Sequence, residues 1–255
     1  MPLGIDRNSR EKIAPLFSEY RFDRVLIDSV LEGNFGTAIA DSIECPRVAR
    51  LDSGAFTILG GDPGSKDTIK LIRRKPIYYI TPQNRSWRDF LDYYFCDKIS
   101  TIKFTDFTCK KLNNDRLNFI IKNLIKGYEL RRLDKQLAEQ LPKDIRNEYF
   151  FENYHTIKDF LDRGIGYCIL DGTRIVSAAT AVARSKRAID IEIETEASYR
   201  RQGLGTLVGA KLISYCLENN IEPKWLSSND ESKKLATCLG YQEAETYKTY
   251  KINQR

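Results

Sequence analysis

The stretch that decides the fold runs over residues 189–206 and reads IDIEIETEASYRRQGLGT. Its first part, residues 189–195, alternates between β-branched and acidic or polar residues, which is typical of a half-buried strand. A glycine-rich turn follows, and an apolar helix is expected over residues 207–217. A turn of this kind at a helix N-terminus favours an anion, because Gly203 and Gly205 let a phosphate approach the backbone N–H groups. The stretch therefore predicts an anion-binding turn between a strand and a helix.

Further strands and helices are expected on both sides of this stretch. The expected strands cover residues 166–170, 174–182 and 225–229, and the expected helices cover residues 157–163 and 231–239. Asp171 and Gly172 form a strong hairpin signal, so three antiparallel strands lead into the glycine-rich turn. Gly240 is expected to end the last helix.

The first half of the chain predicts a second α/β domain. Its expected helices cover residues 11–20, 24–32, 65–74, 87–95 and 116–125, and its expected strands cover residues 35–43, 48–51, 55–59, 77–80 and 101–108. Residues 133–147 are polar and charged, which is typical of a connecting helix or linker. We therefore expect an N-terminal α/β domain over residues 1–149 and a C-terminal domain over residues 150–255.

The composition of the 255 residues is that of a soluble globular protein, with 42% hydrophobic residues and a net charge of +6. No apolar run approaches the roughly 18 residues that a membrane span needs, and the N-terminus lacks a signal-peptide pattern. The basic clusters at residues 73–75 and 131–132 are isolated, whereas a nucleic-acid-binding protein more often concentrates such charge on one element. We therefore expect a cytoplasmic protein without a membrane or nucleic-acid partner.

The cysteines and the histidine argue against a metal site. The six cysteines lie far apart without a Cys-x-x-Cys pair, and the chain has a single histidine. Most of the cysteines lie in apolar runs, so we expect them to be buried and reduced.

The glycine-rich turn and a second motif resemble the GNAT acyltransferase superfamily. Arg200, Gly203 and Gly205 match the Arg/Gln-x-x-Gly-x-Gly/Ala turn with which that family holds the pyrophosphate of acetyl-CoA. The second signature of the family is matched by Asn229, Ser232, Leu235, Leu239, Gly240 and Tyr241. The resemblance implies the GNAT fold, a mixed and mostly antiparallel sheet flanked by helices, preceded here by the second α/β domain.

The resemblance also implies a set of cofactor-binding residues and a similarity to one bacterial subgroup of the family. The expected contacts to acetyl-CoA, the cosubstrate, are Thr195, Arg200, Arg201, Gln202, Gly203, Leu204, Gly205, Thr206, Asn229 and Ser232. The chain further resembles a bacterial subgroup that carries an extra N-terminal domain and includes the zwittermicin A resistance acetyltransferases. We hypothesise that the N-terminal domain is a degenerate GNAT-like half that walls the acceptor site.

The acidic strand and the second motif suggest catalytic groups. Amine acylation requires a deprotonated amine and a proton for the leaving thiolate. GNAT enzymes commonly take the base from the strand before the turn, where we favour Glu192 and then Glu194; the alternative is a solvent-facing acidic stripe. The tyrosine that commonly serves as the acid is replaced by Ala236, so Tyr241 becomes the candidate acid, with Tyr247, Ser232 or water as alternatives.

The resemblance therefore predicts an N-acetyltransferase that transfers an acetyl group from acetyl-CoA to a primary amine of a small molecule, as a monomer or homodimer. One alternative is acetylation of a protein N-terminus or lysine. Another is a non-catalytic acyl-CoA sensor, which Ala236 would favour and which would release no free CoA.

Overall fold

The computed structural model of the chain describes residues 2–123, 125–146 and 153–253. The chain separates into two compact units: unit 1 comprises Met1–Phe104 and Thr246–Arg255, and unit 2 comprises Thr105–Glu245. The division into residues 1–149 and 150–255 stays a prediction, and its expected boundary lies outside the described residues.

Unit 2 contains the strands and helices that surround the glycine-rich turn. The strands are β7 (Tyr128–Arg132), β8 (Gly166–Asp171), β9 (Arg174–Arg184), β10 (Ala188–Thr195) and β11 (Glu222–Ser227), together with the end of β6 (Ile99–Thr108) and the start of β12 (Gln242–Ile252). The helices are α4 (Asn114–Lys122), α5 (Lys135–Glu139), α6 (Ile157–Arg163), the 3-10 helix η4 (Ala197–Tyr199), α7 (Leu204–Glu218) and α8 (Asp230–Leu239).

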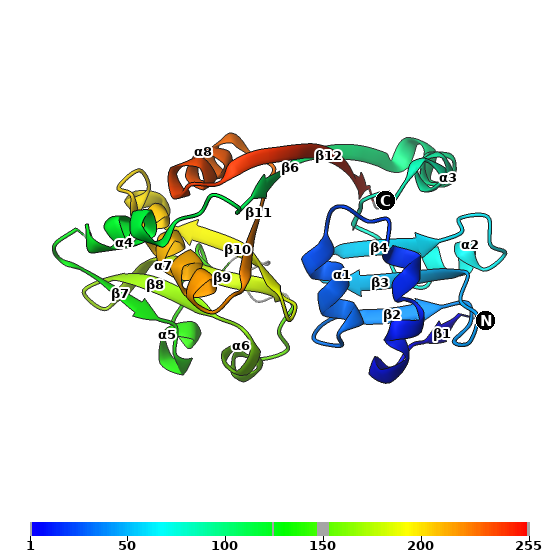
Figure 1. The fold of residues 1–255 in the computed structure, drawn as a ribbon, viewed down its shortest axis with the longest axis horizontal. Coiled ribbons are helices and arrows are strands. Elements are labelled where there is room, and N and C mark those ends of the chain that lie inside the picture. The colour runs from blue at the N-terminus through cyan, green and yellow to red at the C-terminus, as the bar shows by residue number, and fades with distance from the viewer. Residues whose placement is uncertain (1, 124, 147–152, 254–255) are drawn as a thin grey trace. The chain divides into compact units, whose positions relative to one another are not determined.

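The sheet of unit 2 is mixed and mostly antiparallel. Strands β7, β8, β9 and β10 pair antiparallel in that order, β10 pairs parallel with β11, and β11 pairs antiparallel with β6 (Figure 1). Asp171 pairs with Arg174 at the β8–β9 hairpin, where Gly172 has a φ of 58°, so the expected hairpin is confirmed. This is the mixed, helix-flanked sheet that the resemblance implies.

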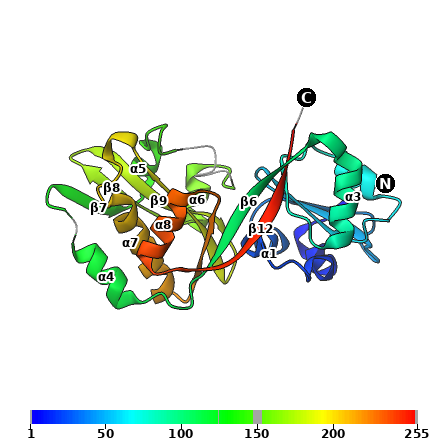
Figure 2. The same cartoon turned by 90° about the horizontal axis from the view of Figure 1, so that it is seen from above.

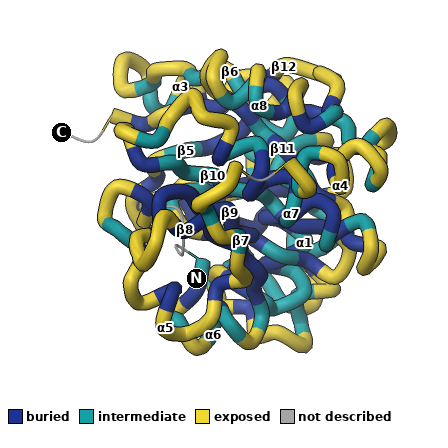
Figure 3. The backbone as a smooth tube through the Cα atoms, turned by 90° about the vertical axis from the view of Figure 1, so that its left-hand side faces the viewer, coloured by how far each residue is buried: buried dark blue, intermediate teal, exposed yellow. Residues whose placement is uncertain are grey.

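Helix α7 forms the centre of the packing in unit 2. It packs against β8, β9 and β10, and α4 and α8 lie beside it (Figure 2). Residues of β8 and β9 are almost all buried (Figure 3). Phe107, Trp225, Leu239 and Tyr241 form a core cluster with residues of α4 and α7, so the helix that follows the glycine-rich turn is fixed from several sides.

Unit 1 has its own mixed sheet. Its strands are β1 (Leu3–Gly4), β2 (Thr37–Ala40), β3 (Val48–Ser53), β4 (Phe56–Gly61) and β5 (Tyr79–Ile80), with the start of β6 and the end of β12. Its helices are η1 (Arg7–Lys12), η2 (Ala14–Phe17), α1 (Arg24–Leu31), α2 (Thr68–Ile72), α3 (Arg85–Phe95) and η3 (Cys96–Lys98). Strands β1 to β4 pair antiparallel in order, β4 pairs parallel with β5, and β5 pairs antiparallel with β12.

Several local expectations about elements are wrong. Residues 11–20 lie partly in two 3-10 helices and not in one α-helix, because Pro15 lacks the N–H that a continuous helix needs. Helix α2 begins after Asp67, not at Ser65. Strands β7 and β12 are additional elements that the sequence did not predict.

The cysteines correct another expectation. Cys168 and Cys216 are buried, but Cys45, Cys96 and Cys238 are exposed.

In the described ranges, with residues 1, 124, 147–152 and 254–255 left aside, no helix is long and apolar enough to cross a membrane.

Candidate functional site

Strands β10 and β11 pair at their first residues and then part. Residues 188–190 of β10 pair with residues 222–224 of β11. Beyond this point β10 continues beside β9 to Thr195, whereas residues 225–227 of β11 pair with β6. The opening in the hydrogen-bond ladder leads along β10 towards the glycine-rich turn.

The turn presents an uncapped helix N-terminus. Arg201 and Gly203 have positive φ values of 64° and 81°. Gly203 is the N-cap of α7 and has no side chain that could accept a hydrogen bond from the first turn. The first N–H groups of an α-helix have no intrahelical acceptor, and a Cβ at Gly203 would meet nothing within 4 Å. The turn therefore has both the donors and the space for an anion such as a phosphate.

Two glycines allow α7 to lie close to β10. A Cβ at Gly205 would lie 3.3 Å from Thr195 Oγ1, and a Cβ at Gly209 would lie 2.6 Å from Ile193 Cδ1. These residues are one helical turn apart, so they share the helix face that packs on the strand. The close approach brings the N-terminus of α7 to the end of β10.

Arg200 folds back onto the end of β10. Its Nε donates to Thr195 O at 3.0 Å, and its Nη2 lies 4.0 Å from Glu194 Oε2. The Thr195 hydroxyl lies 2.8 Å from the hydroxyl of Ser177 on β9, which also donates to Glu194 O at 3.1 Å. The structure thus brings together Arg200, Glu194 and Thr195, and it adds Ser177, a fully buried serine that the sequence did not indicate.

The other turn residues have different surroundings. Arg201 lies 3.7 Å from Glu231 of α8, and Gln202 Oε1 accepts a hydrogen bond from Tyr128 at 3.0 Å. Leu204 is buried in the core, so it can offer only its backbone N–H, and Thr206 is half-buried.

The candidate bases lie on the sheet face away from α7. Ile191 and Ile193 pack against the core around α7, so the alternation of β10 turns Glu192 and Glu194 to the other face. Both glutamates are half-buried, and they lie opposite Thr180 and Ala178 of β9. Their place beyond Asp190 puts them where β10 and β11 part.

The second motif has local structural roles. Asn229 is the N-cap of α8, and its side chain accepts from the Ser232 N–H at 2.8 Å. Ser232 Oγ accepts from Trp225 Nε1 at 3.1 Å. The second of these contacts joins α8 to β11, the strand that parts from β10. The cofactor roles of Asn229 and Ser232 stay predictions.

Tyr241, the predicted acid, lies in the core. Its hydroxyl donates to Pro223 O at 2.9 Å, and burial raises its pKa well above the ordinary value of 10.0. The phenol proton is therefore held within the core by Pro223 O. Ala236 is fully buried in the same cluster, and Tyr247 belongs to unit 1, where its hydroxyl lies 3.1 Å from Asp23 Oδ1.

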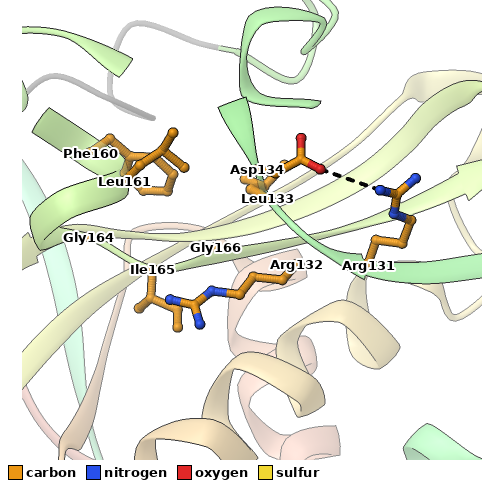
Figure 4. Close-up of a pocket in the computed structure, with 9 residues that line it drawn as sticks. All are labelled: Arg131, Arg132, Leu133, Asp134, Phe160, Leu161, Gly164, Ile165 and Gly166. Atoms are coloured by element: carbon orange, nitrogen blue, oxygen red, sulfur yellow. Dashed lines mark hydrogen bonds and ion pairs between the residues drawn. The ribbon is translucent and has the colours of Figure 1, made fainter. Parts of the chain in front are cut away.

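A separate pocket opens where β7 ends. It holds about 520 Å³ and is lined by Arg131, Arg132, Leu133, Asp134, Phe160, Leu161, Gly164, Ile165 and Gly166 (Figure 4). Arg131 pairs with Asp134 at 3.3 Å. This pocket includes none of the residues expected to hold the cofactor. Within the described part of the chain, no group of three or more histidine, cysteine, aspartate or glutamate residues could hold a metal ion.

A mixed sheet with two parting strands, and an uncapped helix behind a glycine turn, define an acyltransferase of the N-acetyltransferase class. The family model described as "GNAT acetyltransferase" matches residues 14–250, and the chain belongs to this family. Members of the family generally use acetyl-CoA.

Individual relatives agree with this assignment. The chain is 26% identical over 201 residues to the "Uncharacterized N-acetyltransferase YdfB" of Bacillus subtilis, covering 68% of this chain and 77% of that protein. A GCN5-related N-acetyltransferase-like protein from Streptococcus suis has a similar structure, with a TM-score of 0.80, 27% identity and coverage of 96% and 99% of the two chains. A tandem GNAT protein from the clavulanic acid biosynthesis pathway shares the fold, with a TM-score of 0.60, 11% identity and coverage of 98% and 97%.

Proposed function

We propose that the chain transfers the acetyl group of acetyl-CoA to a primary amine of a small molecule, in the cytoplasm and as a monomer or homodimer. The observation that carries the proposal is the parting of β10 and β11 next to the uncapped N-terminus of α7. This arrangement offers donors for the phosphates at one end of the opening and carboxylates, Glu192 and Glu194, along its edge.

The cofactor is held by the turn. Backbone N–H groups of residues 202–206 bind the pyrophosphate, since the first turn of α7 lacks acceptors and Gly203 leaves space. Arg200 and Arg201 add positive charge at the same turn. Thr195, Asn229 and Ser232 complete the expected contacts, and bound acetyl-CoA supplies an activated thioester.

The chain's own residues manage the protons. Glu192, directly or through a water, accepts a proton from the ammonium group, and the free amine forms the new C–N bond at the thioester carbonyl. The nitrogen loses its second proton to solvent water as the C–S bond breaks. The thiolate takes a proton from water or from the Ser232 hydroxyl, which water then reprotonates, because the Tyr241 phenol is buried and bonded to Pro223 O. Glu194 stays paired with Arg200 and is the second candidate base.

The test measures free thiol released from acetyl-CoA with a panel of small primary amines and, separately, with peptides that carry a free N-terminus or a lysine. We expect turnover with small amines and a rate lower by a factor of about 10² to 10⁴ with the Glu192→Gln variant. Turnover with the peptides alone would show that the acceptor is a protein amine and not a small molecule. If neither panel released free thiol from acetyl-CoA, the proposed activity would be contradicted. Small amines related to the zwittermicin A type of antibiotic belong in the panel, because the similarity to that subgroup stays a prediction.

A further inference from the structure

The tip of the β8–β9 hairpin contacts the segment that leads into the glycine-rich turn. Asp171 ends β8, Arg174 begins β9, and the two pair across the hairpin. Both side chains reach residues 196–199, which connect β10 to the turn. This hairpin lies outside the family motifs that were matched in the sequence.

Arg174 and Glu196 form the first of these contacts. Arg174 donates to both carboxylate oxygens of Glu196, at 2.9 Å from Nε and also from Nη2. Glu196 is buried, and its carboxylate also accepts from Ser198 Oγ at 3.0 Å. Its backbone N–H donates to Val176 O at 2.9 Å. A bidentate Arg–carboxylate pair fixes orientation as well as distance, so it fixes the start of the connecting segment.

Tyr199 forms the second contact. Its hydroxyl donates to Asp171 Oδ2 at 2.8 Å, and that hydrogen bond raises the pKa of Tyr199, which keeps the phenol a donor. The Arg174 guanidinium lies 5.9 Å from the centre of the Tyr199 ring. Arg174 therefore contacts both ends of the connecting segment, and Tyr199 directly precedes the first residue of the turn.

The turn needs such support because of its backbone. Arg201 has a Cβ and yet has a left-handed φ of 64°, a conformation that costs free energy and persists only where the surroundings impose it. Backbone N–H groups bind an anion well only if they already point to it before binding.

We propose that Arg174, Glu196, Asp171 and Tyr199 are positioning residues that hold residues 200–206 in the conformation that binds the pyrophosphate of acetyl-CoA. The proposal rests on the proposed cofactor function of the turn. The four residues do not touch the reacting atoms. They affect cofactor binding through the backbone conformation of the turn.

The test compares acetyl-CoA binding by calorimetry in the wild type and in the variants Glu196→Gln, Arg174→Gln and Tyr199→Phe. We expect dissociation constants about tenfold higher in Glu196→Gln and Arg174→Gln. A smaller rise is expected in Tyr199→Phe, which keeps the ring beside Arg174. Thr173→Ala, an exposed position in the same hairpin turn, is the matched control and should leave binding unchanged.

A second readout separates positioning from loss of fold. The ³¹P resonances of the bound pyrophosphate should shift in Glu196→Gln and Arg174→Gln but not in Thr173→Ala, at temperatures where all variants are folded by circular dichroism. Arg174→Lys, which keeps the charge without the bidentate geometry, should bind between the wild type and Arg174→Gln. Folded variants with unchanged affinity and unchanged ³¹P spectra would overturn the positioning role alone. A wild type that does not bind acetyl-CoA would overturn the cofactor function and the positioning role together.

Discussion

Gly203 combines a left-handed backbone, with a φ of 81°, and open space at the place of a Cβ. Changing it to alanine should lower the free energy of unfolding by about 1 kcal/mol, because a Cβ disfavours this conformation. The same change should weaken acetyl-CoA binding, since the new methyl group takes the space proposed for the phosphate. Thermal melting and calorimetry measure the two effects.

Gly127→Ala is the control for this prediction. Gly127 also has a positive φ, of 102°, and also meets nothing within 4 Å. It should lose similar stability and keep the affinity for acetyl-CoA. Equal losses of affinity in both variants would show that Gly203 acts through stability and not through the phosphate.

Glu192 is the residue on which the proposed chemistry depends. Glu192→Gln should lower kcat by a factor of about 10² to 10⁴, the usual contribution of a general base, and leave the dissociation constant of acetyl-CoA unchanged. Asp190→Asn, on the same face of β10 but at the last position paired with β11, is the control. Steady-state kinetics with an amine that the wild type acetylates measure kcat for each variant. Equal kcat values for Glu192→Gln and the wild type would show that Glu192 is not the general base.

The glycine-rich turn was easier to locate from the sequence than the surroundings of Tyr241. Glycines in a strand–turn–helix context indicate an anion site because their lack of a side chain is itself the requirement. Whether Tyr241 faces a cleft or the core depends on contacts with Pro223 and Trp225, which lie on another strand. The supporting residues Ser177 and Arg174 carry no pattern in the sequence, because strand register brings them to β10 and the turn, whereas Glu196 directly follows β10.

Gly209 lets α7 lie close to β10 without displacing the Ile193 side chain. An alanine there would place a Cβ 2.6 Å from Ile193 Cδ1, so the strand side chain or the helix must move. Gly209→Ala should therefore cost about 1 kcal/mol more stability in the wild type than in the Ile193→Val background, which lacks that atom. A double-mutant cycle by chemical denaturation measures the difference, and additive effects would contradict the close packing.

Helix α6 should show a pH-dependent stability. Hydrogen bonds from Arg163, together with the His155 N–H, hold the pKa of Asp159 below its ordinary value of 3.8. A lowered pKa in the folded state stabilises the protein above the unfolded-state pKa of about 4, and this contribution disappears as the pH falls through the folded-state value. Asp159→Asn should therefore lower Tm at pH 7 and differ less from the wild type as the pH falls below about 4.

Asp162→Asn is the control on the same helix. Asp162 pairs with Lys158, but both side chains are mostly exposed, at 57% and 84%. Exposed pairs contribute little, so Tm should change little at any pH. A larger loss for Asp162→Asn than for Asp159→Asn at pH 7 would contradict the assignment.

Elements with strong periodicity were predictable, and strands β7 and β12 were not. The sequence predicted α3, α8 and the β8–β9 hairpin because apolar spacing, caps and turn residues agree there. Strand β7 carries mostly exposed residues, and the first half of β12 is exposed throughout. Strands with so little burial lack the alternation on which prediction depends, and their pairing is set by tertiary contacts.

Each unit contains two parallel strands that pair over only two or three residues and then separate. In unit 2 these strands are β10 and β11, and β10 leads to the glycine-rich turn. In unit 1, β4 pairs with β5 at Phe56 and Thr57 only. Beyond that point the Tyr20 hydroxyl lies 2.9 Å from Leu59 O and 3.0 Å from Thr81 O, so it bridges the two strands.

The surroundings of strand β4 in unit 1 differ from those of β10. A Cβ at Gly60 would lie 2.6 Å from Leu16 O and 2.7 Å from the Phe17 ring, so η2 packs directly on β4. Helix α2 begins after Asp67, whose carboxylate pairs with Lys70 at 2.7 Å. These contacts support the hypothesis that unit 1 is a degenerate GNAT-like half, and they predict one cofactor site per chain.

The return of the last strand to unit 1 could not be predicted from the sequence. The last residues of the chain, Thr246–Arg255, belong to unit 1, and β6 and β12 each continue from one unit into the other. A composition shift can indicate a linker between consecutive domains, but it cannot indicate that a terminal strand returns to the first one.

The assignment of the turn as the acetyl-CoA site is tested by calorimetric titration of acetyl-CoA into the wild type and the Arg200→Glu/Gly203→Glu double variant, at a temperature where both are folded. We expect one site per chain in the wild type and no binding in the double variant, because two carboxylates then occupy the place of the pyrophosphate. Absence of binding in the wild type, or binding that survives in the double variant, would contradict the assignment of the turn as the acetyl-CoA site.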